Sequence, residues 1–392
     1  MLKRFIAKVV EGTSLGEAES GEAMSFIMGG EVPPSQIASF ITALRMKGET
    51  VQEITGFART MRAKAVQIRA RNGEKVVDTC GTGGDGKGTF NISTAATLVA
   101  AGGGCTMAKH HNRSVSSQCG SADVLEALGV DYALPPERAE TCLQQLGLAF
   151  LFAPTFHPAT KNAAGPRKEI GIRTIFNLLG PLTNPAGATV HLAGLYREDL
   201  LRPIAEVLRN LGYTSAFVVH SEDHCDEISI TGKTTVCELK EGTFRTYQID
   251  PEMVGLKRAS LKEIQGGTPK KNAEILLQVL GGKTGPRRDV VLLNAAAVFL
   301  AVEKASSLRE GVEMARESID SGRAMRKLQA LIQFSKGGKD VLAKDCRDKE
   351  RGAPGKKEPV QTERIGGEGS VPSSAAGFHG SHLQPRPDCR HC

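Results

Sequence analysis

Residues 77–94 read Val-Asp-Thr-Cys-Gly-Thr-Gly-Gly-Asp-Gly-Lys-Gly-Thr-Phe-Asn-Ile-Ser-Thr and place a glycine-rich turn between two apolar segments. Val76–Val77 predicts the end of a short strand, and the apolar run 95–101 predicts a helix. Glycines let backbone N–H groups approach a phosphate, and a helix N-terminus supplies unpaired donors and partial positive charge. We therefore expect a small substrate that carries phosphate.

A glycine-rich turn can also be a purely structural connection between a strand and a helix. Here it is followed by small amide and hydroxyl side chains at Asn91, Ser93 and Thr94, which can hydrogen-bond phosphate oxygens. A second polar cluster follows at residues 109–117. Together these features favour a ligand site over a structural turn.

The composition is that of a globular protein, with 392 residues of which 40% are hydrophobic and 24% charged. The net charge of +7 is modest and the Lys and Arg residues are dispersed, so a nucleic-acid partner is not expected. Nine scattered cysteines, an odd number, favour a reducing cytoplasmic location. The N-terminus predicts an amphipathic helix instead of a signal peptide, and no apolar run reaches the length of a membrane span.

Two kinds of pattern divide the chain. Residues 1–70 carry apolar residues at helical spacing and predict a small all-helical unit. From about residue 75, short apolar runs alternate with helical patterns, which predicts a larger α/β unit with a mostly parallel central sheet. The predicted strands are 76–77, 192–195, 216–219, 227–230 and 235–239, and the predicted helices are 92–102, 121–129, 136–146, 198–211, 272–280, 288–303 and 307–318.

Five prolines interrupt residues 154–190, where a helix is predicted over 170–179, and we interpret this stretch as a crossover that packs partly on the N-terminal helices. After residue 336 the sequence is rich in Gly, Pro, Ser and charge, which predicts a disordered tail. The expected domains are a helical domain (1–70, with part of 165–190 packed on it), an α/β domain (71–164 and 191–336) and the tail (337–392).

The second polar cluster, residues 108–117, combines cations with an amide. Lys109 and Arg113 can neutralise phosphate, and Asn112 can hydrogen-bond a sugar or a ring edge. The alternative interpretation is a solvated basic turn. Because this cluster, like the first, follows an apolar run, phosphate chemistry at two successive strand ends is the favoured interpretation.

Asp226 and Glu227 are adjacent carboxylates near a predicted strand boundary. Such a pair suits Mg²⁺, which is bound by a few protein oxygens and keeps water and substrate phosphates as its other ligands. Taken alone, the pair could equally be a solvated acidic turn. Two phosphate-type loops elsewhere in the chain favour a metal ion that bridges to a diphosphate.

The proline-rich crossover contains two further candidate residues. His157 precedes Pro158, and a lone histidine of this kind more often has a structural role. Arg167 could hold a carboxylate through two hydrogen bonds, or could tie the crossover to the rest of the fold. No catalytic triad or protein nucleophile is apparent, so the residues point to binding and polarising a phosphorylated sugar.

Five sequence motifs resemble those of the anthranilate phosphoribosyltransferases of tryptophan biosynthesis. They follow the order and spacing of that family, and the resemblance runs from about residue 3 to residue 337. It implies a hinged fold like that of the pyrimidine nucleoside phosphorylases, with a small helical and a larger α/β domain. The motifs are Gly81-Thr82-Gly83-Gly84-Asp85-Gly86, Asn91-Ile92-Ser93-Thr94, Lys109-His110-His111-Asn112-Arg113-Ser114-Val115-Ser116, Gly120-Ser121-Ala122-Asp123-Val124-Leu125 and the stretch 173–185.

The resemblance also implies an activity and a set of roles. The activity is transfer of a phosphoribosyl group from phosphoribosyl diphosphate to the amino group of anthranilate, with Mg²⁺ as cofactor, in a homodimer joined through the helical domains. Phosphoribosyl diphosphate would contact Gly81, Gly83, Gly84, Asp85, Asn91, Ser93, Thr94, Lys109 and Ser121. Anthranilate would contact Asn112, Arg167, His110, His157 and Pro181, and Mg²⁺ would be held by Ser93, Asp226 and Glu227.

The chain departs from the family pattern Lys-His-Gly-Asn-Arg at His111, which replaces the glycine. If that glycine supplies a positive φ or a close backbone approach, an imidazole there crowds the acceptor pocket and changes the rate or the acceptor. Two other functions stay open. A pyrimidine nucleoside phosphorylase is disfavoured by Arg167 and the 173–185 stretch, and a catalytically weak paralogue that binds nucleic acid or another acceptor is disfavoured by Asp226 and Glu227.

Overall fold

The computed structural model describes residues 1–113 and 118–337, which lie in one compact unit. Predictions for residues 338–392, including the disordered tail, therefore fall outside the described residues, and the domain boundaries stay predictions. Within the described ranges, no helix combines the length and the apolar character needed to cross a membrane.

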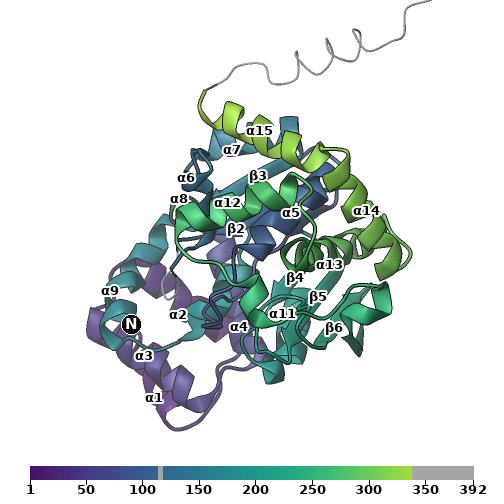
Figure 1. The fold of residues 1–392 in the computed structure, drawn as a ribbon. Helices are drawn as coiled ribbons and strands as arrows, with labels where there is room; N and C mark the ends of the chain where they lie inside the picture. Colours follow the sequence, from purple (N-terminus) through teal and green to yellow (C-terminus); the bar gives the residue numbers. More distant parts are fainter. Residues whose placement is uncertain (114–117, 338–392) are drawn as a thin grey trace, which may run out of the picture. The chain divides into compact units, whose positions relative to one another are not determined.

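The first 63 residues form four helices, whose buried faces carry apolar residues at helical spacing (Figure 1). Thr50 starts the fourth helix with a capping box, because its side chain accepts from the backbone N–H of Glu53 while the Glu53 carboxylate accepts from the backbone N–H of Thr50. The helices are α1 (Lys3–Val10), α2 (Glu17–Gly29), α3 (Pro34–Lys47) and α4 (Val51–Ala63).

A seven-stranded sheet in the order β3-β2-β1-β4-β5-β6-β7 forms the centre of the remaining chain. The first five of these strands are parallel, and β6 and β7 continue the sheet antiparallel. The predicted fold class is confirmed, although three strands, β2, β3 and β7, were not predicted. The strands are β1 (Val76–Asp78), β2 (Thr106–His111), β3 (Leu148–Phe152), β4 (Val190–Gly194), β5 (Ser215–Ser221), β6 (Thr234–Lys240) and β7 (Thr243–Ile249).

The strand predicted at 227–230 is wrong, and the hydrogen bonds of this segment explain why. The backbone N–H and C=O of Ile228 are both bound by the side chain of Asn294, and the N–H of Ser229 donates to the hydroxyl of Thr234. Side chains therefore satisfy the groups that a strand would use in a ladder. The segment stays a loop between β5 and β6.

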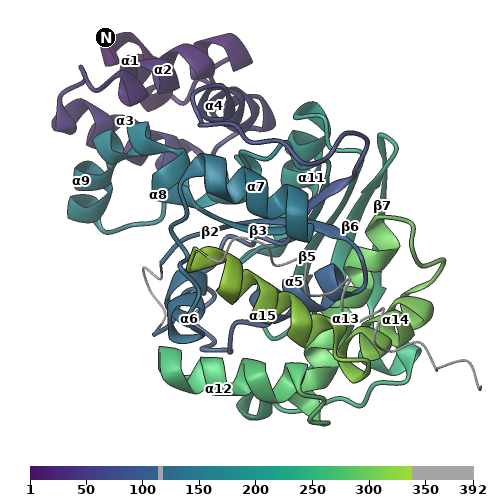
Figure 2. The ribbon, with the colours of Figure 1, turned by 90° about the horizontal axis from the view of Figure 1, so that it is seen from above.

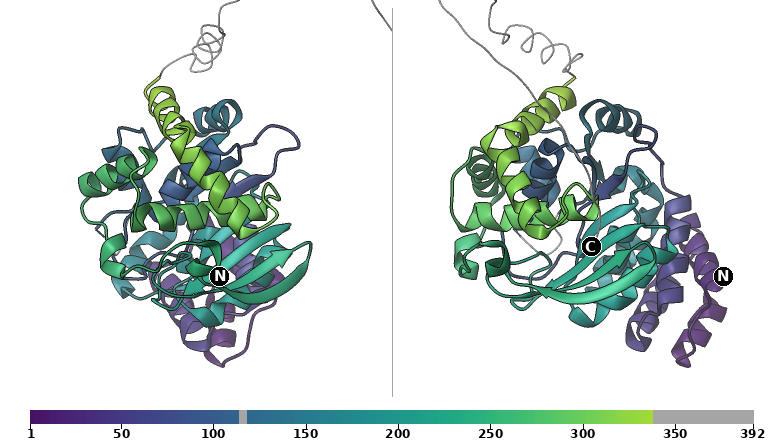
Figure 3. Two further views of the ribbon diagram at one scale, coloured as in Figure 1. Left: turned by 45° about the vertical axis from the view of Figure 1, so that its right-hand side comes forward. Right: turned by 90° about the vertical axis from the view of Figure 1, so that its right-hand side faces the viewer.

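Helices cover both faces of the sheet. Figure 2 shows α7 and α11 on one face and α5, α13 and α15 on the other. The right panel of Figure 3 shows the N-terminal helices on the side of the sheet away from α14 and α15. Apart from those of the crossover, the helices that follow β1 are α5 (Ile92–Gly102), α6 (Ser121–Ala127), α7 (Pro136–Leu146), α11 (Leu201–Asn210), α12 (Pro269–Leu280), α13 (Pro286–Ala301), α14 (Leu308–Asp320) and α15 (Arg323–Ser335).

The crossover after β3 consists of short helical pieces. The helix predicted over 170–179 forms only from Ile175 onward, because α9 ends at Ile170 and its C-cap, Gly171, adopts a φ of 63°. α9 packs against α2 and α3, and its Asn162 donates to the carbonyl of Met28 at 3.0 Å. The pieces are α8 (Ala153–Phe156), η1 (Pro158–Thr160), α9 (Lys161–Ile170), α10 (Ile175–Leu179) and η2 (Gly180–Leu182), and the later 3₁₀ turns are η3 (Glu198–Leu200), η4 (Pro251–Val254) and η5 (Leu261–Ile264).

Candidate active site

The candidate site lies where the parallel strands β1, β2, β4 and β5 end. Their carboxyl ends meet at one edge of the sheet, which is where ligands bind on sheets of this kind. The loops that follow these strands contain the glycine-rich turn, the described residues 112–113 and 118–120, residues 195–197 and the loop 222–233. Residues far apart in the sequence are therefore brought together there.

The glycine-rich turn is held against β4 and against the loop after β5. The backbone N–H of Thr82 donates to Gly194 O at 2.9 Å, and that of Gly83 donates to the Asp226 carboxylate at 2.7 Å. A Cβ at Gly81 would lie 2.9 Å from both Gly194 O and Asp226 Oδ2, so this position has no room for a side chain. Gly81 is therefore needed for close approach, whereas Gly83 and Gly84 are needed for conformation, since their φ angles are 66° and 71°.

Asp226 and Glu227 point back toward the glycine-rich turn and the start of α5. Glu227 Oε1 accepts from the backbone N–H of Ser93 at 3.2 Å. Both residues keep some solvent exposure, yet protein surrounds their carboxylates, and this desolvation raises the pKa of each. The negative charge of Asp85 raises the pKa of Asp226 further, and Asp226 does the same to Glu227.

This arrangement fits a bound cation. Two mutually repelling carboxylates stand beside Asp85, whose buried Oδ2 has no hydrogen-bond partner among the described residues. In the described part of the chain, no three His, Cys, Asp or Glu side chains form a complete metal-binding group. Mg²⁺ does not need one, because it is commonly held by one or two carboxylates together with water and substrate phosphates. Asp226 and Glu227 are the side chains that would hold it.

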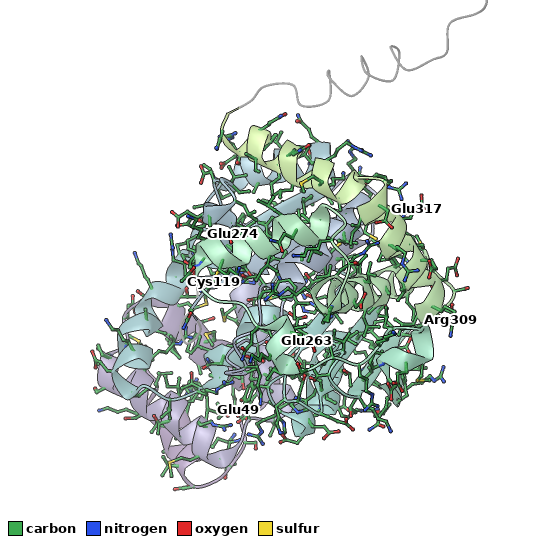
Figure 4. The ribbon with its side chains drawn as sticks, in the orientation of Figure 1. Glu49, Cys119, Glu263, Glu274, Arg309 and Glu317 are labelled. Carbon is green, nitrogen blue, oxygen red and sulfur yellow. The ribbon has the colours of Figure 1, made fainter. Side chains whose placement is uncertain are left out.

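The N-terminus of α5 gathers the predicted phosphate-binding hydroxyls. Thr94 Oγ1 donates to Ser121 Oγ at 3.3 Å, which brings α5 and α6 together at this point. The side-chain amide of Asn91 already forms two hydrogen bonds. It donates to the carbonyl of Cys119 (labelled in Figure 4) at 3.3 Å and accepts from Asn272 Nδ2 at 2.9 Å. The Asn91 side chain therefore holds these loops together, and Asn272 is a supporting residue that the sequence did not reveal.

The last three residues of β2 are Lys109, His110 and His111, so the alternative of a solvated basic turn is wrong for them. All three side chains are buried, and Lys109 Nζ donates to the carbonyl of Thr79. The Lys109 ammonium also opposes the rise in the pKa of Glu227. Asn112, by contrast, is exposed, and Arg113 forms an ion pair with Asp123 of α6 at 2.6 Å.

His110 and His157 form a buried pair on the other side of β2 from Lys109. Their ring centroids lie 5.1 Å apart, and His110 Nδ1 lies 2.9 Å from Gly180 O, beside the buried Pro181. Burial lowers the pKa of each imidazole to about 4, so both are neutral near pH 7. His110 Nε2 is buried and has no hydrogen-bond partner in the part of the chain that the structure describes, which leaves one ring nitrogen available to a ligand.

Two arginines of the crossover differ in what they contact. Arg167 stacks on Phe176, 4.9 Å from the ring centroid, and forms no ion pair with any described residue. Arg173 donates to the carbonyl of Gly84 in the glycine-rich turn and lies over the Tyr196 ring at 4.0 Å. Sequence reasoning did not select Arg173 as a site residue, because nothing in its local pattern shows that the crossover returns to this turn.

Comparison with known proteins gives a consistent result. Residues 3–65 match the helical bundle domain of the glycosyl transferase family, and residues 73–325 match its a/b domain. The anthranilate phosphoribosyltransferase of Moorella thermoacetica is 57% identical over 334 residues, which are 85% of this chain and 98% of that protein. That of Petrotoga mobilis is 52% identical over 335 residues, or 86% and 97% of the two chains.

Solved structures agree with these relatives. The anthranilate phosphoribosyltransferase of Thermus thermophilus is similar with a TM-score of 0.80 and 46% identity, covering 85% of this chain and 99% of that one. The enzyme of Saccharomyces cerevisiae in complex with PRPP and Mg is similar with a TM-score of 0.77 and 28% identity, covering 85% and 98%.

Proposed function

The chain belongs to the anthranilate phosphoribosyltransferases of the glycosyl transferase family, and from this premise we propose that it transfers the phosphoribosyl group of phosphoribosyl diphosphate to the amino group of anthranilate. The products are N-(5-phosphoribosyl)anthranilate and diphosphate. The observation that carries the proposal is the contact of Asp226 with Gly83 and of Glu227 with Ser93. These contacts bring two carboxylates beside the glycine-rich turn and a helix N-terminus, an arrangement that supports binding of a metal-bound diphosphate.

The donor would bind along the glycine-rich turn and the N-terminus of α5. Backbone N–H groups of the turn and hydroxyls of α5 and α6 would contact its phosphates, and Lys109 would neutralise part of their charge. Asp85 shapes the turn, since its Oδ1 accepts from the backbone N–H of Lys87 at 3.1 Å. The proposed donor contacts are Gly81, Gly83, Gly84, Ser93, Thr94, Lys109 and Ser121, with Asn91 acting through the loops that it joins.

Mg²⁺ would be held by Asp226 and Glu227, with Ser93 close by and donor oxygens completing its ligands. Its positive charge would offset the burial and the repulsion that raise the pKa of the two carboxyl groups. When bound, the ion would stabilise the negative charge that develops on the departing diphosphate.

Anthranilate would lie near the buried histidine pair. Its amine can donate to His110 Nε2, and its ring can pack against His157 and Pro181. Within the described residues, Arg167 carries no ion pair that would compete for the acceptor carboxylate, and Asn112 is exposed after the end of β2. The arylamine is neutral at pH 7, so the displacement at the anomeric carbon needs no strong base in the protein.

Two further properties are part of the proposal. A homodimer joined through the helical domain is implied by the family resemblance. A cytoplasmic location is supported by the cysteines, because Cys80, Cys105, Cys142, Cys225 and Cys237 of the described residues are free thiols.

The test is a fluorescence assay of anthranilate consumption with phosphoribosyl diphosphate and Mg²⁺. We expect turnover by the wild type, and a steeply higher Mg²⁺ requirement when Asp226→Asn is combined with Glu227→Gln. The matched control is Asp250→Asn with Glu252→Gln, an acidic pair at the end of β7. Absence of turnover by the folded wild-type protein would contradict the function, and an unchanged Mg²⁺ requirement would remove Asp226 and Glu227 from the metal site.

A further inference from the structure

The loop 222–233 joins β5 to β6 and carries Asp226 and Glu227 without the support of a strand ladder. Burial and mutual repulsion oppose the ionised form of these two carboxyl groups, and Asp85 adds to the repulsion. A loop that holds repelling charges together must be fixed by other contacts, since repulsion would otherwise spread them apart. Two side chains supply such contacts.

Asn294 fixes the residue that directly follows the carboxylate pair. Its Oδ1 accepts from the backbone N–H of Ile228 at 3.1 Å, and its Nδ2 donates to Ile228 O at 2.8 Å and to Val290 O at 2.9 Å. Asn294 is fully buried in α13, which packs against β4 and β5. The amide therefore binds both backbone groups of Ile228 from a rigid helix, as a neighbouring strand would.

Asp223 fixes the loop from within. Its Oδ1 accepts from the hydroxyl of Ser221 and, at 3.0 Å, from the backbone N–H of Cys225. Its Oδ2 accepts from Ser229 Oγ at 2.6 Å and from the hydroxyl of Thr231. These hydrogen bonds hold the pKa of Asp223 low, at about 2. Because the donors precede and follow the carboxylate pair, the two sides of the loop are tied together through one carboxylate.

We propose that Asn294, together with Asp223, is a positioning residue that holds Asp226 and Glu227 in the geometry needed for Mg²⁺. The proposal rests on the function proposed above. Neither residue touches substrate in this role; each acts through the loop, in the way that hydrogen-bond partners of metal ligands orient those ligands. Asn294 lies 67 positions after Glu227 in the chain (294 − 227), so only the packing of α13 on the sheet brings it there.

The critical variant is Asn294→Asp, which keeps the side-chain size but replaces the amide donor with an oxygen that faces two carbonyls. We expect the Mg²⁺ concentration for half-maximal activity to rise about 10- to 100-fold, as is typical when a partner of a metal ligand is removed. The kcat at saturating Mg²⁺ and the KM for anthranilate should stay close to wild type. Asp223→Asn should act in the same direction, and it provides the test if Asn294→Asp does not fold.

The matched control is Ser318→Ala, which removes an equally buried hydrogen bond, from Ser318 Oγ to Val99 O at 2.7 Å, without touching the loop. Binding of Mn²⁺ with inorganic diphosphate, followed by electron paramagnetic resonance, gives a readout independent of turnover. An unchanged metal requirement in folded Asn294→Asp, or an equal rise in Ser318→Ala, would overturn the proposal. Wild-type protein without turnover would refute the function alone, because Mn²⁺ binding still compares the variants.

Discussion

His111 takes the place of a family glycine, and its surroundings differ from those expected. Its side chain is buried on the opposite face of β2 from His110, because neighbouring residues in a strand point to opposite faces. The ring lies among Tyr132, Phe150 and Phe152, with centroid distances of 5.7–6.4 Å. His111 is not among the residues with positive φ, and it continues β2 in register with Phe152. The imidazole is therefore part of an aromatic cluster, directed away from His110 and His157.

This placement predicts the effect of His111→Gly. Removing the ring leaves a cavity among the aromatic side chains and puts a flexible residue into β2, so we expect the free energy of unfolding to fall by about 1–3 kcal/mol. Anthranilate turnover should change little, whereas His110→Ala on the opposite face should lower it. Urea unfolding and the fluorescence assay measure the two effects. A large gain in turnover for His111→Gly would show that the imidazole does crowd the acceptor site.

At the scale of elements, β2 and the crossover are joined through the pair His110 and His157. His110 comes from the sheet and His157 from the turn between α8 and η1, and each is almost fully buried. Burial is the main cause of the lowered pKa of both, and the charge of His157 also disfavours protonation of His110. The contact between these elements therefore depends on neutral imidazoles.

The pH dependence of stability follows from this pair. The folded-state pKa of about 4 lies below the ordinary value of 6.5, so between these pH values the unfolded chain binds more protons than the folded chain. The contribution of this pair to the free energy of unfolding should have its full value above pH 6.5. It should decrease as the pH drops toward 4, by up to about 3 kcal/mol for each histidine. Urea unfolding at pH 7 and 4.5 should show a smaller acid loss for His157→Asn than for wild type. The solvent-exposed control His224→Asn should resemble wild type, and equal losses in all three proteins would contradict the explanation.

At the scale of the whole molecule, the N-terminal helices are tied to the α/β part by polar contacts as well as by packing. Arg59 donates to Asn210 O at 2.6 Å and Arg62 to Leu211 O at 3.0 Å, both from α4 to the C-terminal end of α11. Cations are favourable there, because the last carbonyls of a helix lack partners and carry partial negative charge. On the other side of the helical unit, the crossover helix α9 packs against α2 and α3.

The last helix of the described fold ends before residue 340. The family match ends at residue 325, and α15 ends at Ser335. We therefore expect a protein lacking residues 340–392 to retain anthranilate turnover and thermal stability close to those of the full chain. Activity and the melting temperature of the two proteins, prepared in parallel, provide the measurement. A loss of activity in a folded truncated protein would assign the segment a role in catalysis.

The local signals in the sequence account for much of the fold and part of the site. Alternating apolar and helical patterns predicted the α/β class, which the sheet confirms. The glycines of the 81–88 turn predicted an approach of backbone N–H groups to phosphate, which stays a prediction, and the structure adds that Gly81 packs closely against Gly194 and Asp226. The strand at Thr106–His111 was missed because its last three residues are polar, yet they are buried. The strand predicted at 227–230 is wrong for a different reason. Its apolar pattern is that of a strand, but the side chain of Asn294 binds the backbone N–H and C=O of Ile228 that a strand would use for pairing.

By itself, the sequence determined the fold class, and it predicted the glycine-rich turn and the carboxylate pair as parts of the site, because each is encoded in spacing or in adjacent residues. Tertiary structure alone decided which of these groups meet: Asp226 with Gly83, Glu227 with Ser93, and Asn294 with the loop after β5. It also decided where His111 points. Such contacts depend on strand order and on which face of a strand is buried, and these are properties of the packed sheet that no local pattern records.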